Sequence, residues 1–187
     1  MRSRWAGALC VWLLASVMGC FAVWAGESTP ELSVFELVRS DDGLAVNFAA
    51  RFDLPPSVED ALLKGVPLHF VAEAALFRER WYWRDQPVSR VSRTWRLAYQ
   101  PLTRSYRVSF GGLSQNFDSA AEAVAVVRRM AGWRLAEPGQ LEAGGKYYVE
   151  FSYKLDTTLL PRPMQIGIGG QPEWLLQLEK VQRLPAP

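Results

Sequence analysis

The sequence predicts an α+β domain that is mainly antiparallel β, with sandwich-like packing of its sheets and one main helix. Two observations support this fold class. Apolar residues alternate with polar residues in a series of short segments, and Pro, Gly and Asp residues are concentrated between those segments. Helical periodicity is found at residues 119–131 and, over a shorter stretch, at residues 57–64.

The first part of the domain is expected to consist of strands joined by tight turns. Asp41-Asp42-Gly43 is typical of a two-stranded hairpin, so the segments before and after it should pair. Ser57 is expected to cap the short helix at residues 57–64, and Gly65 is expected to end it. A three-stranded meander should follow. The strands of this part are expected at residues 31–38, 43–52, 66–83, 88–99 and 106–110.

The main helix is expected at residues 119–131. Ser119 and Glu122 have the spacing of a capping box, and the apolar residues from Ala120 to Met130 form one stripe. Gly132 should end the helix. After a polar loop, the clearest alternation in the chain predicts a strand at residues 146–156, and an extended spacer at 160–163 leads to a last strand at 174–181.

Residues 1–25 are typical of a secretory signal peptide, because two arginines precede an apolar run at residues 9–24 and small residues follow it. Cleavage after Ala25 is the expected processing. Two alternatives stay open. Val17-Met18-Gly19-Cys20 resembles a lipobox, in which Cys20 would be lipidated. The apolar run, although a little short of the roughly 20 residues that span a bilayer, would otherwise remain as an uncleaved anchor. Each alternative predicts an exported protein in the periplasm, either free or held at the inner membrane.

Residues 26–187 are expected to form a single β-rich domain. Two of the 21 basic residues lie in the leader, so the remainder balances the 19 acidic residues and argues against nucleic acid as a partner. Both cysteines, Cys10 and Cys20, also lie in the leader, and His69 is the one histidine of the chain. With so few nucleophilic or metal-ligating side chains, we expect neither an enzyme nor a bound cofactor or metal.

The most unusual segment is Arg80-Trp81-Tyr82-Trp83-Arg84. On a strand, Trp81 and Trp83 would share one face, and Tyr82 would share the other with arginine. Tryptophan, tyrosine and arginine are the residues enriched at interface hot spots, and tryptophan also anchors proteins at membrane boundaries. Alternatively, the tryptophans close the end of the core and the arginines stack on them. The five residues Arg80, Trp81, Tyr82, Trp83 and Arg84 are therefore the candidate binding site.

Three other features contain residues that can take part in catalysis or ligand binding. His69 and Glu73 share a face of their predicted strand, but no nucleophile or set of metal ligands accompanies them. Gly167-Ile168-Gly169-Gly170 lacks the helix and lysine of a phosphate-binding loop, so it predicts a bend. Paired carboxylates could hydrolyse a glycoside. The candidate carboxylates on strands are Glu73, Glu79, Glu150 and Asp156.

Arginines are crowded into residues 78–107, whereas acidic residues are concentrated at residues 41–60. The simplest interpretation is that these two groups pair across neighbouring strands. The alternative is a basic face directed at an anionic lipid, a cell-wall polymer or an acidic partner.

Several motifs resemble one family. The chain is similar, from about Leu54 to Trp174, to exported proteobacterial proteins catalogued as domain of unknown function 4390. The resemblance implies export but no activity and no catalytic residues. Members of that family tend to be encoded beside a membrane sensor histidine kinase, which implies a periplasmic accessory role. The matching segments are Gly65-Val66-Pro67-Leu68, Arg80-Trp81-Tyr82-Trp83, Leu97-Ala98-Tyr99, residues 102–108, residues 112–117, Gly132-Trp133-Arg134 and residues 155–163.

Taken together, these features predict a non-enzymatic interaction domain of the periplasm, accessory to a membrane sensor kinase or another envelope protein. One alternative is a carrier of a small hydrophobic ligand or lipid, which requires an apolar cavity of more than about 300 Å³ between the sheet and the main helix. A second alternative is a hydrolase that uses carboxylates alone, which requires two buried acidic side chains within about 10 Å of each other in a cleft.

Overall fold

The computed structural model describes residues 29–82, 84–142, 144–168 and 171–185. Within these ranges the chain is mainly antiparallel β and forms two sheets accompanied by short helices, which confirms the predicted fold class. The leader with Cys10 and Cys20 lies outside the described residues, as does Trp83.

The smaller sheet has three strands in the order β1-β2-β7. The Asp41-Asp42-Gly43 hairpin is confirmed, and Gly43 adopts φ +109°, which favours glycine. A Cβ at this position would lie 2.1 Å from the carbonyl oxygen of Ala136, so the turn also requires glycine for packing. The strands of this sheet are β1 (Glu31–Ser40), β2 (Gly43–Arg51) and β7 (Arg129–Ala136).

The larger sheet has six strands in the order β6-β5-β4-β3-β8-β9, and every neighbouring pair is antiparallel. Strands β3 to β6 form a meander, to which β8 and β9 are added beyond β3. The strands are β3 (Leu68–Arg78), β4 (Gln86–Gln100), β5 (Ser105–Phe110), β6 (Leu113–Phe117), β8 (Tyr147–Leu155) and β9 (Gln177–Arg183).

The two sheets pack face to face around an aromatic core. Phe48 of β2 lies at its centre, because its ring is 6.2 Å from that of Trp95, 4.9 Å from Phe151 and 5.7 Å from Tyr153. These three partners belong to the larger sheet. The hydroxyl of Tyr153 donates to the carbonyl oxygen of Val127 at 2.9 Å, so this buried phenol is also satisfied.

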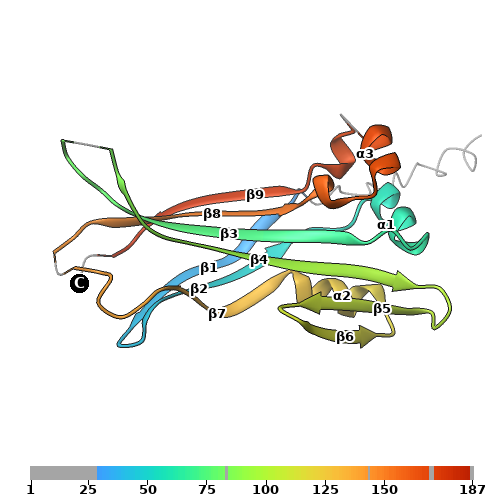
Figure 1. Cartoon of the computed structure of the whole chain (residues 1–187), viewed down its shortest axis with the longest axis horizontal. Coiled ribbons are helices and arrows are strands. Elements are labelled where there is room, and N and C mark those ends of the chain that lie inside the picture. Colours follow the sequence, from blue (N-terminus) through green and yellow to red (C-terminus); the bar gives the residue numbers. More distant parts are fainter. Residues whose placement is uncertain (1–28, 83, 143, 169–170, 186–187) are drawn as a thin grey trace, which may run out of the picture.

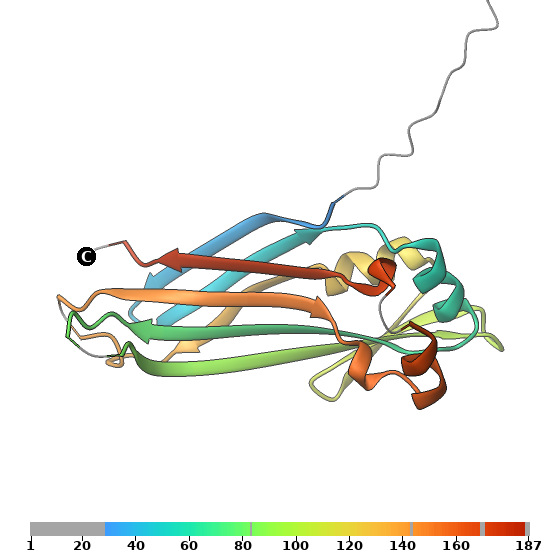
Figure 2. The same cartoon turned by 90° about the horizontal axis from the view of Figure 1, so that it is seen from above.

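The molecule is elongated, and its helices lie at one end (Figures 1 and 2). At this end are α1 (Pro56–Leu63), α3 (Arg162–Ile168) and the 3₁₀ turns η1 (Thr157–Leu159) and η2 (Pro172–Trp174). We call this region, with Leu175, the helix end. The connection between β3 and β4 lies at the opposite end of the long axis (Figure 1). The remaining helix, α2 (Ala120–Val127), packs against β4, β5 and β6.

The prediction of a main helix at residues 119–131 was wrong at its C-terminal end. Ser119 does cap the helix, because its hydroxyl accepts from the backbone N–H of Glu122. The helix ends at Val127, however, and the chain continues as β7. Met130 lies opposite Phe48 of β2, and Trp133 is buried in the core. Pairing with the open edge of β2 therefore outweighs the helical spacing of these apolar residues.

Other differences concern element ends. β3 stops at Arg78 rather than at residue 83, and the segment after Gly112, where no strand was predicted, forms the additional strand β6. The predicted spacer at residues 160–163 instead leads into α3, in which Pro163 occupies a first-turn position. Ser57 makes no capping hydrogen bond, because α1 begins at Pro56 and the Ser57 hydroxyl is buried without a partner.

Candidate interaction site

Residues Glu79–Asp85 connect β3 to β4, and we call this segment the tip loop. Trp81 is 94% exposed and Tyr82 is 68% exposed, and their rings meet edge to face with centroids 4.9 Å apart. The segment is thus a loop and not the end of a strand, and the interpretation that Trp81 closes the core is wrong. Two aromatic rings are presented to solvent at one extremity of the molecule.

Hydrogen bonds fix the base of the tip loop. Asp85 accepts from the backbone N–H of Arg80 at 3.1 Å with one carboxylate oxygen. Its other oxygen accepts from the hydroxyl of Tyr148 at 2.9 Å. The ring of Tyr148 stacks on Phe77 with centroids 5.3 Å apart. The guanidinium of Arg80 donates to the side chain of Gln86. Asp85 therefore joins the two ends of the loop to β8.

Ion pairs add to this base. Arg183 of β9 donates to Glu79 at 2.8 Å, and the backbone N–H of Glu79 donates to the carbonyl of Lys146. Burial, followed by the hydrogen bond to Asp85, raises the pKa of Tyr148 to about 12. Tyr148 is consequently a neutral donor at physiological pH. The base of the tip loop is therefore held by hydrogen bonds and an ion pair on both sides of Trp81 and Tyr82.

The arginines of residues 78–107 were predicted to pair with the acidic group at residues 41–60. Arg78 pairs with Glu142 at 2.8 Å. In the parts of the chain that the structure describes, no ion pair joins this arginine group to Asp41, Asp42, Glu59 or Asp60. Arg80 and Arg84 are exposed on either side of the aromatic pair. Cations at the tip loop are thus placed where an acidic or aromatic partner could reach them.

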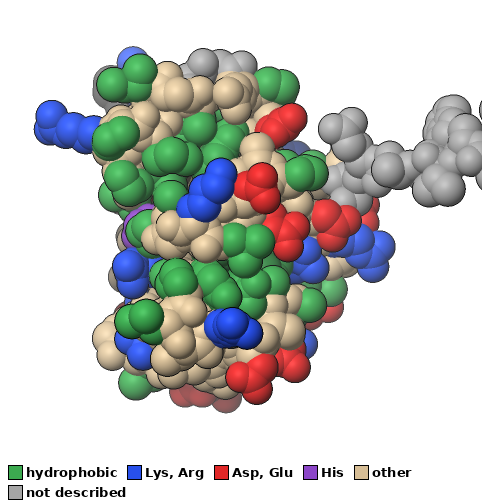
Figure 3. Space-filling model, turned by 90° about the vertical axis from the view of Figure 1, so that its right-hand side faces the viewer, with side chains coloured by type: hydrophobic (Ala, Val, Ile, Leu, Met, Phe, Trp, Pro, Cys, Tyr) green, Lys and Arg blue, Asp and Glu red, His purple; other side chains and the backbone are tan. Residues whose placement is uncertain are grey.

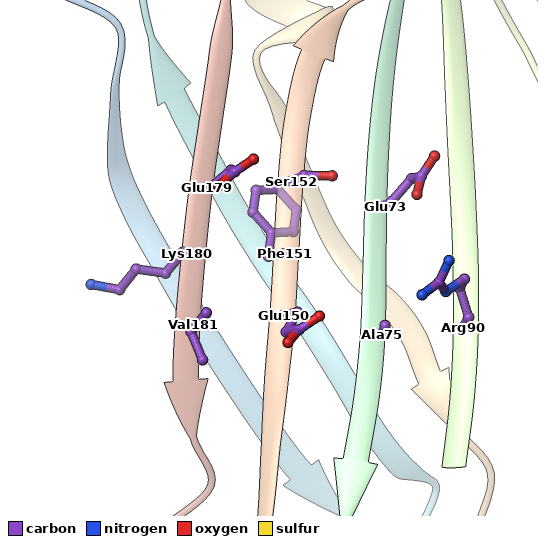
Figure 4. Close-up of a pocket in the computed structure, with 9 residues that line it drawn as sticks. All are labelled: Glu73, Ala75, Arg90, Glu150, Phe151, Ser152, Glu179, Lys180 and Val181. Atoms are coloured by element: carbon purple, nitrogen blue, oxygen red, sulfur yellow. The ribbon is translucent and has the colours of Figure 1, made fainter. Parts of the chain in front are cut away.

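The candidate carboxylates are brought together only in part. Glu73 and Glu150 line an open hollow of about 340 Å³ on the outer face of the larger sheet, together with Glu179 and Arg90 (Figure 4). Glu79 instead pairs with Arg183, and Asp156 caps the backbone of η1. No described acidic side chain is buried, and no group of three possible metal ligands is found among the described residues. The described residues therefore do not include the pair of buried carboxylates that was expected of a hydrolase.

His69 lies on the outer face of β3, opposite Arg96 of β4. Its Nδ1 is buried without a hydrogen-bond partner. Burial, and then the charge of Arg96, lower the pKa of His69, although Asp156 opposes this shift. Glu73 shares this face but is separated from His69 by Val71 along the strand, and no hydrogen bond joins the two side chains among the described contacts.

A second hollow, of about 210 Å³, lies at the helix end and is lined by Ile168, Trp174 and Leu175 among others. Neither hollow lies between α2 and the sheets, where a ligand carrier would hold its cargo, and aromatic side chains fill that region of the core. In the described part of the chain, no helix combines the length and apolar character needed to cross a bilayer.

Sequence reasoning identified Trp81, Tyr82 and the flanking arginines but missed the residues that hold them. Asp85 lies just outside the segment that composition singled out, and Tyr148 lies 63 positions further along the chain. The one available signal was the alternation of β8, which predicts that Tyr148 lies on the outer face of the sheet.

None of the curated proteins or solved structures that were compared matches the chain. A family model described as a domain of unknown function (DUF4390) matches residues 27–184, which is most of the chain and includes the tip loop, both sheets and the helix end. The chain therefore belongs to the DUF4390 family.

Proposed function

We propose that this protein is a non-enzymatic interaction domain of the bacterial envelope, and that the tip loop is its contact surface. The observation that carries the proposal is the 94% exposure of Trp81 on a loop whose base is fixed by Asp85. An exposed indole in water is unfavourable, whereas at an interface it supplies a large apolar contact with little loss of conformational entropy.

The chemistry of the tip loop favours a protein partner. Tyr82 supplies a hydroxyl beside an aromatic ring, and Arg84 supplies a planar cation that can bind a carboxylate in two places. Both are directional groups, which select for one complementary surface. The partner we propose is a protein of the envelope or inner membrane, such as a membrane sensor kinase, with acidic and apolar residues in its exposed part.

Site-specific photocrosslinking tests this function. The full chain is expressed in a Gram-negative bacterium. A photoreactive phenylalanine analogue replaces Tyr82 or, as a matched control, Val181. Val181 is also exposed but lies on the outer face of β9. We expect one protein adduct from position 82, none from position 181, and loss of the adduct when Trp81→Ala is added.

The alternatives give different results. Adducts of equal yield from both positions, or an adduct at position 82 that persists in the Trp81→Ala background, would contradict a contact centred on the tip loop. Retention of a defined hydrophobic ligand by the purified protein would favour the carrier, and hydrolysis abolished by Glu73→Gln would favour the hydrolase.

A further inference from the structure

The helix end exposes aliphatic side chains from several separate segments. Leu159 of η1 is 49% exposed, Ile166 of α3 is 86% exposed and Leu175 after η2 is 73% exposed. Leu102, in the β4–β5 turn at the same end of the long axis, is fully exposed at 100%. Figure 3 looks onto this end and shows hydrophobic side chains gathered over it, with charged groups of both signs between them. Such a concentration indicates a surface that is covered in use.

The hollow at this end offers apolar surface rather than free polar groups. The side-chain amide of Gln165 donates to the carbonyl oxygens of Thr158 and Leu160, each at 2.7 Å. Gln171 donates to the carbonyl of Gly167 at 3.0 Å. These amide donors are already satisfied by backbone, so the hollow is not arranged to select a polar ligand.

The chain enters the domain in the half of the molecule nearer the helix end (Figures 1 and 2). Glu31, the first residue of β1, pairs with Arg51, the last residue of β2, and α1 begins five residues later at Pro56. The apolar run at residues 9–24 ends seven residues before Glu31. Seven residues span at most about 25 Å even when fully extended. If the apolar run stays in a membrane, the helix end therefore lies nearer to that membrane than the tip loop does.

We propose that the helix end rests on the phospholipid bilayer, with Ile166 and Leu175 in the interfacial region and the N-terminal segment still attached. The occupant is the lipid surface, because the short connection to a membrane-binding segment places a bilayer next to these side chains. Among the three fates of the leader, this favours a retained anchor, or lipidation at Cys20 with a longer tether of eleven residues, over release after Ala25. Aliphatic contacts of this size are weak alone but become effective when a tether raises their local concentration.

This orientation directs the tip loop away from the membrane. β4 has 15 residues, which in a strand span about 50 Å. The tip loop would then reach its partner well above the lipid headgroups. The membrane contact does not depend on the identity of that partner.

Lipid photolabelling of the full chain tests the contact. The protein is purified from membranes in detergent and reconstituted into phosphatidylcholine vesicles that contain a diazirine-bearing phosphatidylcholine. After illumination, labelled peptides are located by mass spectrometry, and the intact mass reports whether residues 1–25 and a lipid on Cys20 are present. We expect several-fold more label on residues 157–175 than on the tip loop, and equal labelling at high salt because the contact is apolar.

A pair of substitutions separates this contact from labelling through the tether alone. Ile166→Ser with Leu175→Ser should reduce the label on residues 157–175 several-fold. Leu113→Ser is the matched control, because Leu113 is 77% exposed on β6, and should leave the label unchanged. Equal label at both ends, unchanged label in the double variant, dimer formation through the helix end, or recovery of the native protein without residues 1–25 and without lipid would each overturn the proposal.

Discussion

The two ends of this molecule both expose apolar side chains, but of different kinds. The tip loop presents the aromatic rings of Trp81 and Tyr82 together with exposed arginines, whereas the helix end presents Leu159, Ile166 and Leu175. Aromatic and guanidinium groups interact with preferred geometries and therefore suit one specific protein surface. Aliphatic groups have no preferred direction and suit a fluid surface such as lipid. The difference shows that the chemistry of an exposed group is more informative than its exposure.

The two ends are also held in different ways. The tip loop depends on polar contacts to distant strands, through Tyr148 of β8 and Arg183 of β9. The helix end depends on burial of Leu160 and Trp174 and on the local hydrogen bonds of Gln165. Single substitutions should therefore loosen the tip loop without disturbing the helix end, and the following predictions use this difference.

The largest effect is expected in the core that joins the two ends. Phe48→Ala removes the ring that contacts Trp95, Phe151 and Tyr153, and should lower the free energy of unfolding by about 3–5 kcal/mol. Because both sheets pack on this ring, hydrogen exchange should accelerate at both ends together. Chemical denaturation with exchange measured by mass spectrometry checks this. Acceleration at one end alone would show that the ends belong to separate cooperative units.

A smaller effect is expected at the base of the tip loop. Tyr148→Phe keeps the ring that stacks on Phe77 but removes the hydrogen bond to Asp85, at a cost of about 1 kcal/mol. Amide exchange should become faster in the tip loop and stay unchanged at the helix end. Tyr82→Phe, which removes an exposed hydroxyl, is the control and should alter neither. Faster exchange at the helix end in Tyr148→Phe would mean that the two ends are coupled.

The hydrogen bond between Tyr148 and Asp85 should be lost at alkaline pH. The pKa of Tyr148 is raised from 10.0 to about 12, so the folded protein holds the proton more tightly than the unfolded chain. Its contribution to stability is complete below pH 10 and is lost as the pH rises to about 12. Stability measured against pH in wild type and Tyr148→Phe should converge over this window. A constant difference between the two would contradict the assigned hydrogen bond.

The fold class could be predicted because alternation records burial directly. In β8, the five residues predicted to share a face, from Tyr147 to Leu155, are all buried. The prediction failed where a residue's environment is set by distant parts of the chain. Met130 and Trp133 fit a helix by spacing, but the open edge of β2 recruits them into β7. The end of β3 was misplaced because apolar Trp81 continued a pattern that the sheet no longer supports.

The candidate site was predicted in its exposed half only. Composition singled out Trp81 and Tyr82, because clustered aromatic and arginine residues are unusual on a surface. No local pattern could reveal that Asp85 would be held by Tyr148, since their contact depends on the register of β3 with β8. The helix end was missed for a related reason. Pro161 and Pro163 suggested an extended chain, whereas prolines at a helix start are compatible with α3.

A further small effect concerns His69, near the helix end. Its pKa is lowered, chiefly by burial, so the unfolded chain binds a proton more readily than the folded protein. Its contribution to stability is therefore present above pH 6.5 and decreases as the pH falls below that value. Because His69 is the one histidine of the chain, its ring protons can be followed by NMR without substitutions. A measured pKa at or above 6.5 would contradict the buried environment of its ring.

The smallest effect on stability is expected from the residues proposed to carry function. Trp81→Ala and Ile166→Ser each change a side chain that is mostly in water, so the free energy of unfolding should stay within about 0.5 kcal/mol of wild type. Each should nevertheless abolish or weaken one contact and spare the other: partner crosslinking for Trp81→Ala, and lipid labelling for Ile166→Ser. Thermal denaturation together with the two labelling assays measures both properties in the same samples. If either variant lost both contacts while remaining folded, the two ends would form one binding surface, and the division between a protein-directed tip loop and a lipid-directed helix end would have to be abandoned.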